Sequence, residues 1–499
     1  MTRSNAVLRL SIDPESGLAR YRQLLMQFKQ LFRDQHLKEG DKLPSSRELA
    51  TMLGLSRSTT IKVYDILMSE GYLVSQPKKG LFVAHMAALL PGELSQSHAS
   101  NEGQQIAVVK APLQLNSGID VNAFPNKAWA ASMRRSWLNP DIGVIQGEYH
   151  AGLPKLQQYL ADYLRNVRGL DCDPEQIIIT SGNRDALSIL SHALLSAQPD
   201  KSKVWLENPC FPAMSRFFHW LGRDLNPLGI DQEGAQIPLA DLSQSNQVHL
   251  ALITPNRQYP LGVAMSSLRR QAWLNLLSQA NRNTGLQSQQ GDGGLWLIED
   301  DYDNEFYYQG RLGVPLMSLD ESQHTFLLGS FSKIMFRGLR LGYIVSPKAH
   351  VPRVKKSQRE IGPSASLPMQ SALLDFMESG AFSAHLRRMR RHYRQKRDFL
   401  DDQITHYLSD YCEWQKPNGG MHTLVYIKEK WLQTQPLLDQ AIHKKLLEMA
   451  IEVSALSLYY FDKNDLKQGF VLGFSEPSEA DMIEVLTGLQ NGFMTLLNH

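Results

Sequence analysis

The chain has 499 residues, of which 42% are hydrophobic and 20% are charged. This balance is typical of a soluble globular protein with two or three domains and argues against a disordered or membrane-spanning chain. The net charge of +2 hides an asymmetry, because residues 1–85 carry +5 and the rest of the chain carries −3. A basic end beside a mildly acidic body is consistent with nucleic-acid contact, and a solvated basic face is the alternative.

The cysteines and the apolar runs indicate the cellular compartment in which the protein is expected. Cys172, Cys210 and Cys412 are scattered without the spacing of metal ligands. A sparse, odd set of this kind argues against a disulfide framework or a zinc site and favours a reducing compartment. No apolar segment follows the start, and no run reaches the roughly 18 residues of a membrane span. We therefore expect a cytoplasmic protein with no metal site and no membrane contact.

Residues 19–85 predict three helices followed by a hairpin. Leu24, Phe28 and Phe32 recur at helical spacing in the first helix. Ser45 precedes the second helix and Glu48 follows three residues later, which is the pattern of a capping box. Two short apolar runs on either side of residues 76–80 then predict two strands joined by a basic turn.

The third of these helices is the one expected to face a partner. It begins after Ser56, a good N-cap, and ends at Gly71. Its buried face is expected to hold Ile61, Tyr64, Leu67 and Met68, and its outer face Arg57, Ser58, Thr60 and Lys62. In helix-turn-helix modules such a helix enters the major groove. The candidate DNA contacts are Arg47, Ser56, Arg57, Ser58, Thr60, Lys78, Lys79 and Gly80. A small helical domain that binds protein is the alternative.

Three segments of this module resemble a known family of DNA-binding domains. They are residues 43–50 (LPSSRELA), 55–60 (LSRSTT) and 70–73 (EGYL), and they resemble the winged helix-turn-helix domain of the GntR family over about 65 residues. The resemblance implies a sequence-specific transcription factor that binds double-stranded operator DNA. The wing departs from the family, which often has Arg-Gly-Ser-Gly where this chain has Lys78-Lys79-Gly80.

The remainder of the chain predicts a linker and an α/β domain. Residues 86–112 are rich in small and polar residues, which predicts a flexible linker, and residues 287–294 predict a surface loop. From residue 113 to 499, apolar runs alternate with helical segments, which predicts a mostly parallel sheet covered on both faces. The expected strands are Ile177–Thr180, Val204–Glu207, Leu250–Thr254, Leu295–Ile298, Phe326–Leu328 and Tyr343–Val345. After about residue 380 the chain becomes helical and basic, and a smaller α/β domain closes it.

Lys333 is the candidate reactive residue of the large domain. It follows the apolar run 326–328 and lies between the hydroxyl residues Ser330 and Ser332 and the cationic Arg340. An amine that can bind an aldehyde, hydroxyls that can bind a phosphate and a fixed cation suit pyridoxal phosphate held as a Schiff base.

Three further elements suit the same cofactor. Asp300, near a strand end, can keep the pyridine nitrogen protonated, and Tyr302 can bond the ring hydroxyl. Phe211 is placed to stack on the ring. The turn between a strand and a helix offers backbone N–H groups to the phosphate and consists of Ser181, Gly182, Asn183 and Arg184. Each element alone is weak, and it is their combination and order that predict a cofactor site.

The combination resembles fold type I aminotransferases over residues 113–499, and the fusion with the winged helix resembles the MocR subfamily of GntR regulators. Residues 122–125, Trp129 and residues 254–255, 258–260 and 389–391 also resemble that subfamily. The resemblance implies an α/β fold with a winged helix-turn-helix domain, a pyridoxal phosphate-binding large domain and a smaller C-terminal α/β domain. It also implies a domain-swapped homodimer in which the cofactor and small amines modulate DNA binding.

Two departures bear on the effector. Aminotransferases commonly carry Asn-Pro-Thr-Gly where residues 259–262 are Tyr-Pro-Leu-Gly. Their C-terminal strand commonly carries an arginine that grips a substrate carboxylate, and Val471 stands there in this chain. Valine cannot make a bidentate carboxylate contact. Arg257 is a candidate to replace that contact.

We therefore expect a pyridoxal phosphate-dependent transcriptional regulator whose effector is the cofactor itself or an amine without a standard carboxylate. The alternative is an active aminotransferase with a tethered DNA-binding domain, which would use Lys333, Asp300 and Tyr302. A regulator whose site no longer binds the cofactor is a third possibility.

Overall fold

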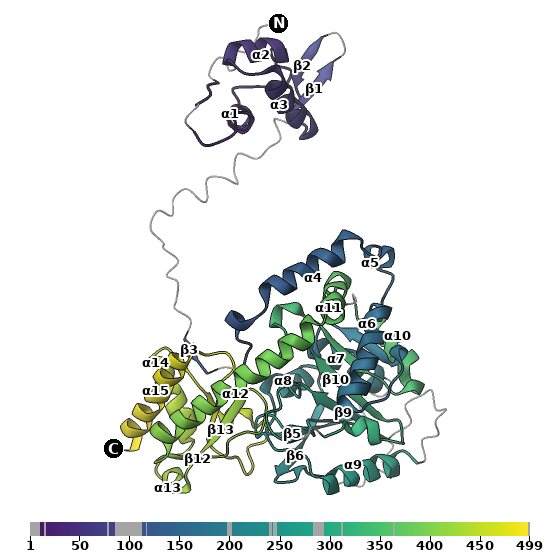
Figure 1. The fold of residues 1–499 in the computed structure, drawn as a ribbon, viewed down its shortest axis with the longest axis vertical. Helices are drawn as coiled ribbons and strands as arrows, with labels where there is room; N and C mark the ends of the chain where they lie inside the picture. Colours follow the sequence, from purple (N-terminus) through teal and green to yellow (C-terminus); the bar gives the residue numbers. More distant parts are fainter. Residues whose placement is uncertain are drawn as a thin grey trace. The chain divides into compact units, whose positions relative to one another are not determined.

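The computed structural model describes residues 10–13, 16–76, 79–84, 112–115, 117–196, 202–238, 242, 247–282, 294–310, 313–362 and 365–497. The chain divides into two compact units, Met1–Lys110 and Ala111–His499 (Figure 1). Three expectations fall mostly or wholly outside the described residues: the linker at 86–112 apart from Pro112, the loop at 287–294 apart from Gly294, and the contact from Lys78.

The described part of the N-terminal unit contains three helices and a hairpin, as the sequence predicts. The helices are α1 (Arg20–Arg33), α2 (Ser46–Leu53) and α3 (Arg57–Ser69), and the antiparallel strands are β1 (Leu73–Gln76) and β2 (Gly80–Val83). The capping box of α2 is present, because the Glu48 N–H donates to Ser45 Oγ and the Ser45 N–H donates to the Glu48 carboxylate. Ser56 caps α3 by accepting a hydrogen bond from the Thr59 N–H.

The core of this unit corrects the expected orientation of α3. Leu24 and Phe28 of α1 are buried with Val63 and Leu67 of α3. The expectation that Thr60 points outward is wrong, because Thr60 is fully buried. The expectation that Ile61 is buried is also wrong, because its side chain is 39% exposed. Helical periodicity explains the correction, since the buried residues 60, 63, 64 and 67 follow a spacing of three and four.

The large unit is built on an eight-stranded sheet in the order β4-β11-β10-β9-β8-β5-β6-β7. Neighbours from β10 to β6 pair in parallel, whereas β11 runs antiparallel to both β10 and β4, and β7 runs antiparallel to β6. The mostly parallel sheet is therefore confirmed. The strands are β4 (Ile177–Thr180), β5 (Ser202–Asn208), β6 (Asp224–Asp231), β7 (Gly234–Ala235), β8 (Val248–Ile253), β9 (Gly294–Asp301), β10 (Thr325–Ser330) and β11 (Gly342–Val345).

Helices cover both faces of this sheet. Leu250 and Leu252 of β8 pack in one hydrophobic cluster with α7, α8 and α10, while the alternate residues Ala251 and Ile253 pack in another with α9. Both faces of β8 are thus buried, which explains its continuous apolar run. The helices that precede or cover the sheet are α4 (Asn126–Leu138), α5 (Ile142–Gln146), α6 (Pro154–Tyr163), α7 (Asn183–Leu195), α8 (Pro212–Trp220), α9 (Ser267–Ala280), α10 (Val351–Ile361) and α11 (Leu367–Glu378).

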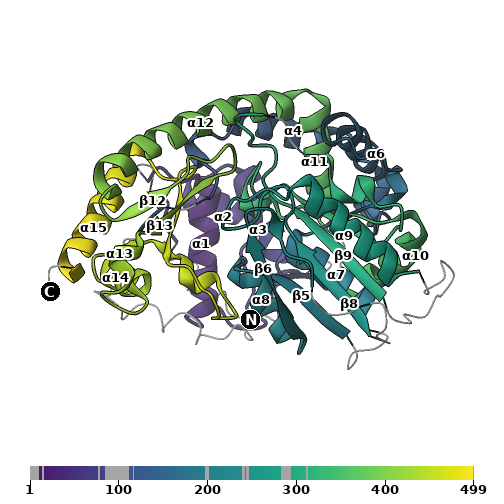
Figure 2. The same ribbon diagram turned by 90° about the horizontal axis from the view of Figure 1, so that it is seen from below.

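A smaller antiparallel sheet closes the chain in the order β12-β13-β16-β15. Figure 2 shows the long helix α12 running from the side of α11 to this smaller sheet and α15. The elements are α12 (Ala381–Leu408), β12 (Cys412–Trp414), β13 (His422–Ile427), α13 (Glu429–Leu432), α14 (Leu438–Glu448), β15 (Ser454–Ala455), β16 (Gly469–Gly473) and α15 (Glu479–Leu497), and β14 (Ile451–Glu452) pairs with β3 (Leu113–Gln114). Across the described part of the chain, no helix combines the length and apolarity that a membrane span requires.

Candidate functional site

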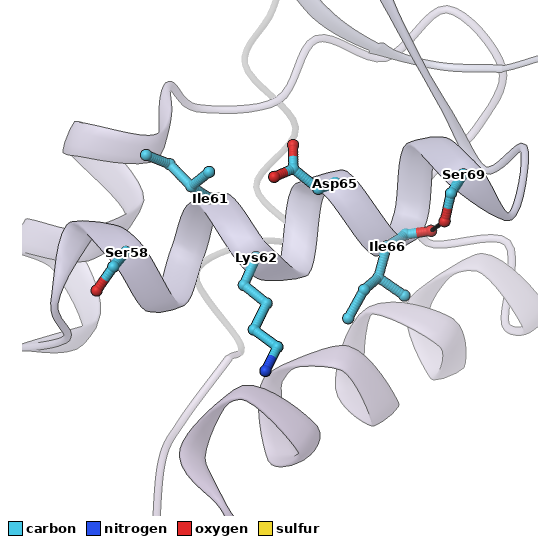
Figure 3. A pocket seen from close by; sticks show the side chains of 6 residues that line it. All are labelled: Ser58, Ile61, Lys62, Asp65, Ile66 and Ser69. Carbon is cyan, nitrogen blue, oxygen red and sulfur yellow. Dashed lines mark hydrogen bonds between the residues drawn. The ribbon is translucent and has the colours of Figure 1, made fainter. Parts of the chain in front are cut away.

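The outer face of α3 presents polar and charged side chains. Arg57, Ser58 and Lys62 are exposed there, as the sequence predicts. Lys62 Nζ lies 4.0 Å from the centre of the Tyr21 ring on α1, a cation–π contact that directs this side chain toward α1. Ser58, Ile61, Lys62, Asp65, Ile66 and Ser69 line a shallow concave surface along the helix (Figure 3).

Thr60 has a structural role instead of the predicted DNA contact. Its hydroxyl lies 2.9 Å from the backbone oxygens of Ser46 and of Arg57 and donates its hydrogen bond there. A buried hydroxyl needs such a partner, because leaving it unpaired is costly. Thr60 therefore ties the start of α2 to the first turn of α3 and fixes the angle between the two helices.

The remaining predicted DNA contacts lie on three other parts of the N-terminal unit. Arg47 is exposed in the first turn of α2, and Ser56 is exposed at the start of α3, where its hydroxyl serves as the cap. Lys79 is exposed before β2. Gly80 has φ of +115°, a conformation that favours glycine, so it allows the sharp entry of the chain into β2.

Lys333 lies in a partly buried position after β10. Its Nζ donates to the backbone oxygen of Ser117 at 2.6 Å and lies 3.2 Å from the Ser117 hydroxyl. Burial, and then the positive charge of Arg337, lower the pKa of Lys333 to about 8, while Asp303 and Glu476 act in the opposite direction. A lysine with a lowered pKa supplies more of the neutral amine that attacks carbonyl groups.

Asp300 lies within β9, not after it, because β9 extends to Asp301. Its Oδ1 accepts a hydrogen bond of 2.9 Å from Asn183 Nδ2, which brings the first turn of α7 to the carboxyl end of β9. Burial, and then the negative charges of Asp301 and Glu207, raise the pKa of Asp300 to about 7. A buried carboxylate in such surroundings is stabilised by a positive partner.

Tyr302 belongs to a group of aromatic side chains around the same strand end. Its ring packs edge-on against Tyr259, with centres 5.8 Å apart, and Tyr259 in turn packs against Phe211 at 5.7 Å. The Tyr302 hydroxyl is buried and has no hydrogen-bond partner among the described residues. Phe211 remains 49% exposed at the start of α8. The predicted stacking residue and the predicted ring partner are thus joined through Tyr259.

The predicted phosphate-binding residues come from two neighbouring loops. A methyl group on Gly342 would lie 3.1 Å from the Gly182 Cα, so the turn before α7 packs closely against the chain two residues after Arg340. Arg340 is exposed, and the Ser330 hydroxyl accepts from the Ser332 N–H at 3.2 Å. The Ser181 N–H already donates to Asp185. The first N–H groups of α7, beginning with Asn183 and Arg184, have no acceptor within the helix.

The position expected for a carboxylate-binding arginine is apolar. Val471 of β16 is 4% exposed and pairs with Leu424 of β13. The hydrophobic cluster around it also contains Tyr459 and Tyr460, and Tyr259 packs against this cluster. The proposed substitute, Arg257, is buried, and its Nε lies 3.2 Å from Asp303 Oδ1. Its guanidinium is therefore already engaged with a carboxylate.

Several residues at this site were missed by the sequence analysis. Ser117 accepts a hydrogen bond from Lys333. Asp303 forms an ion pair with Arg257, and its negative charge acts to raise the pKa of Lys333. Glu207 is buried and accepts from the Thr254 N–H and hydroxyl. Asp303 lies three residues after Asp300, a proximity that marks it as a candidate. Ser117 has no comparable signal, since it lies 216 residues from Lys333.

Comparisons with known proteins agree with this architecture. Residues 20–83 match the family model of bacterial regulatory proteins, gntR family, and residues 146–469 match that of aminotransferase class I and II. The chain is 29% identical over 501 residues to a probable rhizopine catabolism regulatory protein, MocR, of Rhizobium meliloti, covering 98% of this chain and 96% of the relative. It is 30% identical over 488 residues to the pyridoxine biosynthesis transcriptional regulator PdxR of Corynebacterium glutamicum, covering 97% and 98%.

A solved archaeal alanine:glyoxylate aminotransferase shares the fold, with a TM-score of 0.66 and 24% identity over 78% of this chain and 91% of that one. The aminotransferase class I and II family indicates pyridoxal 5'-phosphate as the cofactor. The chain therefore belongs to the MocR subfamily of GntR regulators, in which a DNA-binding helix-turn-helix domain is joined to an aminotransferase class I and II domain.

Proposed function

We propose that this protein is a cytoplasmic transcriptional regulator in which pyridoxal phosphate, held on Lys333, changes the affinity of the N-terminal unit for operator DNA. The observation that carries the proposal is a partly buried lysine with a lowered pKa, together with the buried Tyr302 hydroxyl that has no partner among the described residues. Both lie on the same chain as the exposed basic residues of α3. Allosteric control requires that the ligand contacts differ between two states of the protein.

Three side chains fit the ring of the cofactor. The Asp300 carboxylate, bonded to the neutral Asn183 amide, suits a protonated pyridine nitrogen, whose positive charge would offset the cost of its burial. The Tyr302 hydroxyl, without a partner among the described residues, suits the ring hydroxyl. The Lys333 amine suits the aldehyde. When bound, the cofactor supplies an electron-withdrawing ring.

The phosphate group would lie between the first turn of α7 and the loop that follows β10. Arg340 would supply a positive charge, and the Ser330 and Ser332 hydroxyls would donate hydrogen bonds. The backbone N–H groups at the start of α7, in the turn of Ser181, Gly182, Asn183 and Arg184, would add partial positive charge. Gly182 at φ of +110° permits that turn.

The surroundings of Val471 support an effector without a standard α-carboxylate, either the cofactor itself or a small amine. A carboxylate placed beside Val471 and Tyr459 would lose its hydration without gaining a cation. Arg257 is paired with Asp303, so its use as a clamp would break a buried ion pair, which is strongly unfavourable.

Transamination is a second candidate function, because Lys333, Asp300 and Tyr302 all remain. The apolar surroundings of Val471 weigh against it, since a typical amino-acid donor would bind without its main anchor. Multiple-turnover assays with common amino donors, on protein supplied with pyridoxal phosphate, decide between the two functions. Sustained product formation would favour the enzyme, and its absence would favour the regulator.

A second copy of this chain is the proposed protein partner, in a domain-swapped homodimer. Four large apolar side chains at the end of α4 and in α5 are between 48% and 70% exposed: Trp137, Leu138, Ile142 and Ile145. A cluster of this size on a surface is typical of a protein interface. Light scattering on the purified chain, with Ile142→Asp and Ile145→Asp together as the variant, tests this proposal. A wild-type monomer would contradict it.

The test of the proposed function combines cofactor capture with DNA binding on one preparation of the full chain. Protein mixed with pyridoxal phosphate and reduced with borohydride should carry one phosphopyridoxyl group per chain, and peptide mapping should place it on Lys333. The same protein should enrich specific sequences from a pool of random double-stranded DNA. Modification of other lysines in place of Lys333, or retention of DNA without enrichment, would contradict the proposal.

A further inference from the structure

Ile61 is one of two adjacent residues of α3 whose placement the sequence did not predict. In α3 an apolar side chain lies on the surface at position 61, while the polar Thr60 beside it is buried. This arrangement is the reverse of what solvation alone favours. Residues that break the usual pattern of buried apolar and exposed polar side chains are expected at functional positions. We infer that Ile61 contacts the C5 methyl group of a thymine in the operator and so determines part of the sequence specificity.

The position of Ile61 around the helix axis supports this inference. At about 100° per residue, Ile61 lies between Arg57 and Ser58, about 40° from the first and about 60° from the second. Side chains of a helix also tilt toward its N-terminus, so Ile61 leans over the first turn. That turn is the part of a recognition helix that contacts base edges.

The charges around Ile61 favour bases over phosphates as its partner. Arg57 brings positive charge to this side of the N-terminal unit, which favours approach to DNA. Asp65 lies one turn after Ile61 on the same exposed side (Figure 3), and its carboxylate disfavours a phosphate there. In the major groove, the thymine methyl is the apolar group that a side chain can contact. An isoleucine beside base edges therefore selects thymine.

The packing beneath Ile61 holds it in place. Thr60 binds the backbone of α2 and α3, and the next buried residue, Val63, packs in the core of the unit. The rotation of α3 about its axis is therefore fixed by residues on both sides of Ile61 in sequence. Because the side chain is β-branched, it loses little further freedom when it contacts a base. Ile61 is thus presented to DNA in a defined position.

The inference rests on the proposed DNA-binding function, and its test separates the two. An operator is first selected with the full chain from a pool of random double-stranded DNA. Each thymine of the selected site is then replaced by uracil, which removes only the C5 methyl group. Affinities of the wild type, Ile61→Ala and Ile61→Val are measured on every DNA. Met26→Ala, an exposed apolar change on α1, is the matched control.

At one thymine in each half-site, uracil should weaken wild-type binding by about fourfold, the effect of one buried methyl group. Ile61→Ala should bind the thymine and uracil sites equally, whereas Ile61→Val and Met26→Ala should still prefer thymine. If the wild type shows no such thymine, or if Ile61→Ala keeps the full preference, the inference is wrong while DNA binding stands. If no sequence is enriched from the pool, the proposed function fails, and the inference with it.

Discussion

The two regions that carry function in this chain place their polar groups in opposite ways. On α3 the side chains expected to meet DNA are exposed, and the helix is held by buried groups such as Thr60 and Val63. At the cofactor site Asp300 is buried and Lys333 is partly buried, and their pKa values are shifted by that burial, while Phe211 and Arg340 remain exposed.

The difference follows from the two ligands. DNA is a large polyanion that must be met at the surface, where contacts exchange with water and salt. A small cofactor can be enclosed, so desolvation strengthens each electrostatic contact with it. Changes to α3 should therefore alter affinity for DNA in a graded way, whereas changes around Lys333 should have larger effects on the cofactor.

The largest effect is expected from Lys333→Ala. The variant should lose covalent attachment of pyridoxal phosphate completely, because the amine that binds the aldehyde is absent. Borohydride reduction and mass spectrometry measure the attachment. Lys348→Ala is the matched control, since Lys348 is an exposed lysine paired with Asp173. Full attachment to the Lys333→Ala variant at a single other lysine would contradict the assignment.

A smaller loss is expected from Asp300→Asn. The neutral amide cannot stabilise a protonated pyridine nitrogen, so affinity for pyridoxal phosphate should fall about 10- to 100-fold, the range for a hydrogen bond to a charged group. Equilibrium titration followed by absorbance measures it. The exposed Asp171, changed to Asn, should leave the affinity unaltered. An equal loss of affinity in both variants would contradict the assignment of Asp300 as the partner of the pyridine nitrogen.

On the DNA side, Arg57→Ala should weaken binding to a selected operator by about 5- to 100-fold, as expected for loss of one good base contact. Fluorescence anisotropy measures the affinity, and capture of pyridoxal phosphate by the same variant should be unchanged. Arg33→Ala, at the exposed end of α1, is the control. If Arg57→Ala changes the capture of pyridoxal phosphate, the claim that α3 and the cofactor site have separate roles is wrong.

The pH dependence of cofactor capture follows from the lowered pKa of Lys333. With a pKa of about 8, the amine loses its proton as pH rises through that value, and only the neutral amine reacts. Capture should therefore slow about tenfold for each pH unit below the pKa and level off above it. Stopped-flow absorbance measures the rate. A midpoint near the ordinary lysine pKa of about 10.4 would contradict the burial of this amine.

The smallest effect is expected from Thr60→Val. The variant should destabilise the N-terminal unit by about 1 kcal/mol, because the backbone oxygens of Ser46 and Arg57 lose a hydrogen-bond donor. Thermal unfolding of the full chain, followed by circular dichroism, measures the change. Thr51→Val is the control, since Thr51 is exposed and bonds only to its own helix. If Thr60→Val loses more free energy of DNA binding than free energy of unfolding, Thr60 contacts DNA after all and the structural role is wrong.

The sequence predicted the sheet well because its strands are buried on both faces. All six expected strands are present, one with the expected bounds and the others with ends that differ by at most three residues. The largest extension is at β9, where Glu299, Asp300 and Asp301 continue the strand although they are acidic. These carboxylates are accommodated by tertiary partners such as Asn183 and Arg168, which lie far away in sequence.

The third helix of the N-terminal unit is present as predicted, but its rotation about its axis was not predicted correctly. Thr60 and Ile61 are adjacent, and polarity alone places the first outside and the second inside. The structure reverses them, because Thr60 finds two backbone acceptors in the core. At the cofactor site, the roles of Ser117 and Asp303 depend on contacts between distant segments, and one sequence carries no signal for such contacts.

The measurement that tests the central claim most directly is the affinity for DNA upstream of the protein's own gene, titrated with pyridoxal phosphate, for the wild type and for Lys333→Ala. The proposed function predicts that pyridoxal phosphate changes the dissociation constant or the footprint of the wild type and leaves the variant unaffected. An unchanged affinity and footprint of a wild type that has fully captured pyridoxal phosphate would contradict the claim, as would an equal response of the variant.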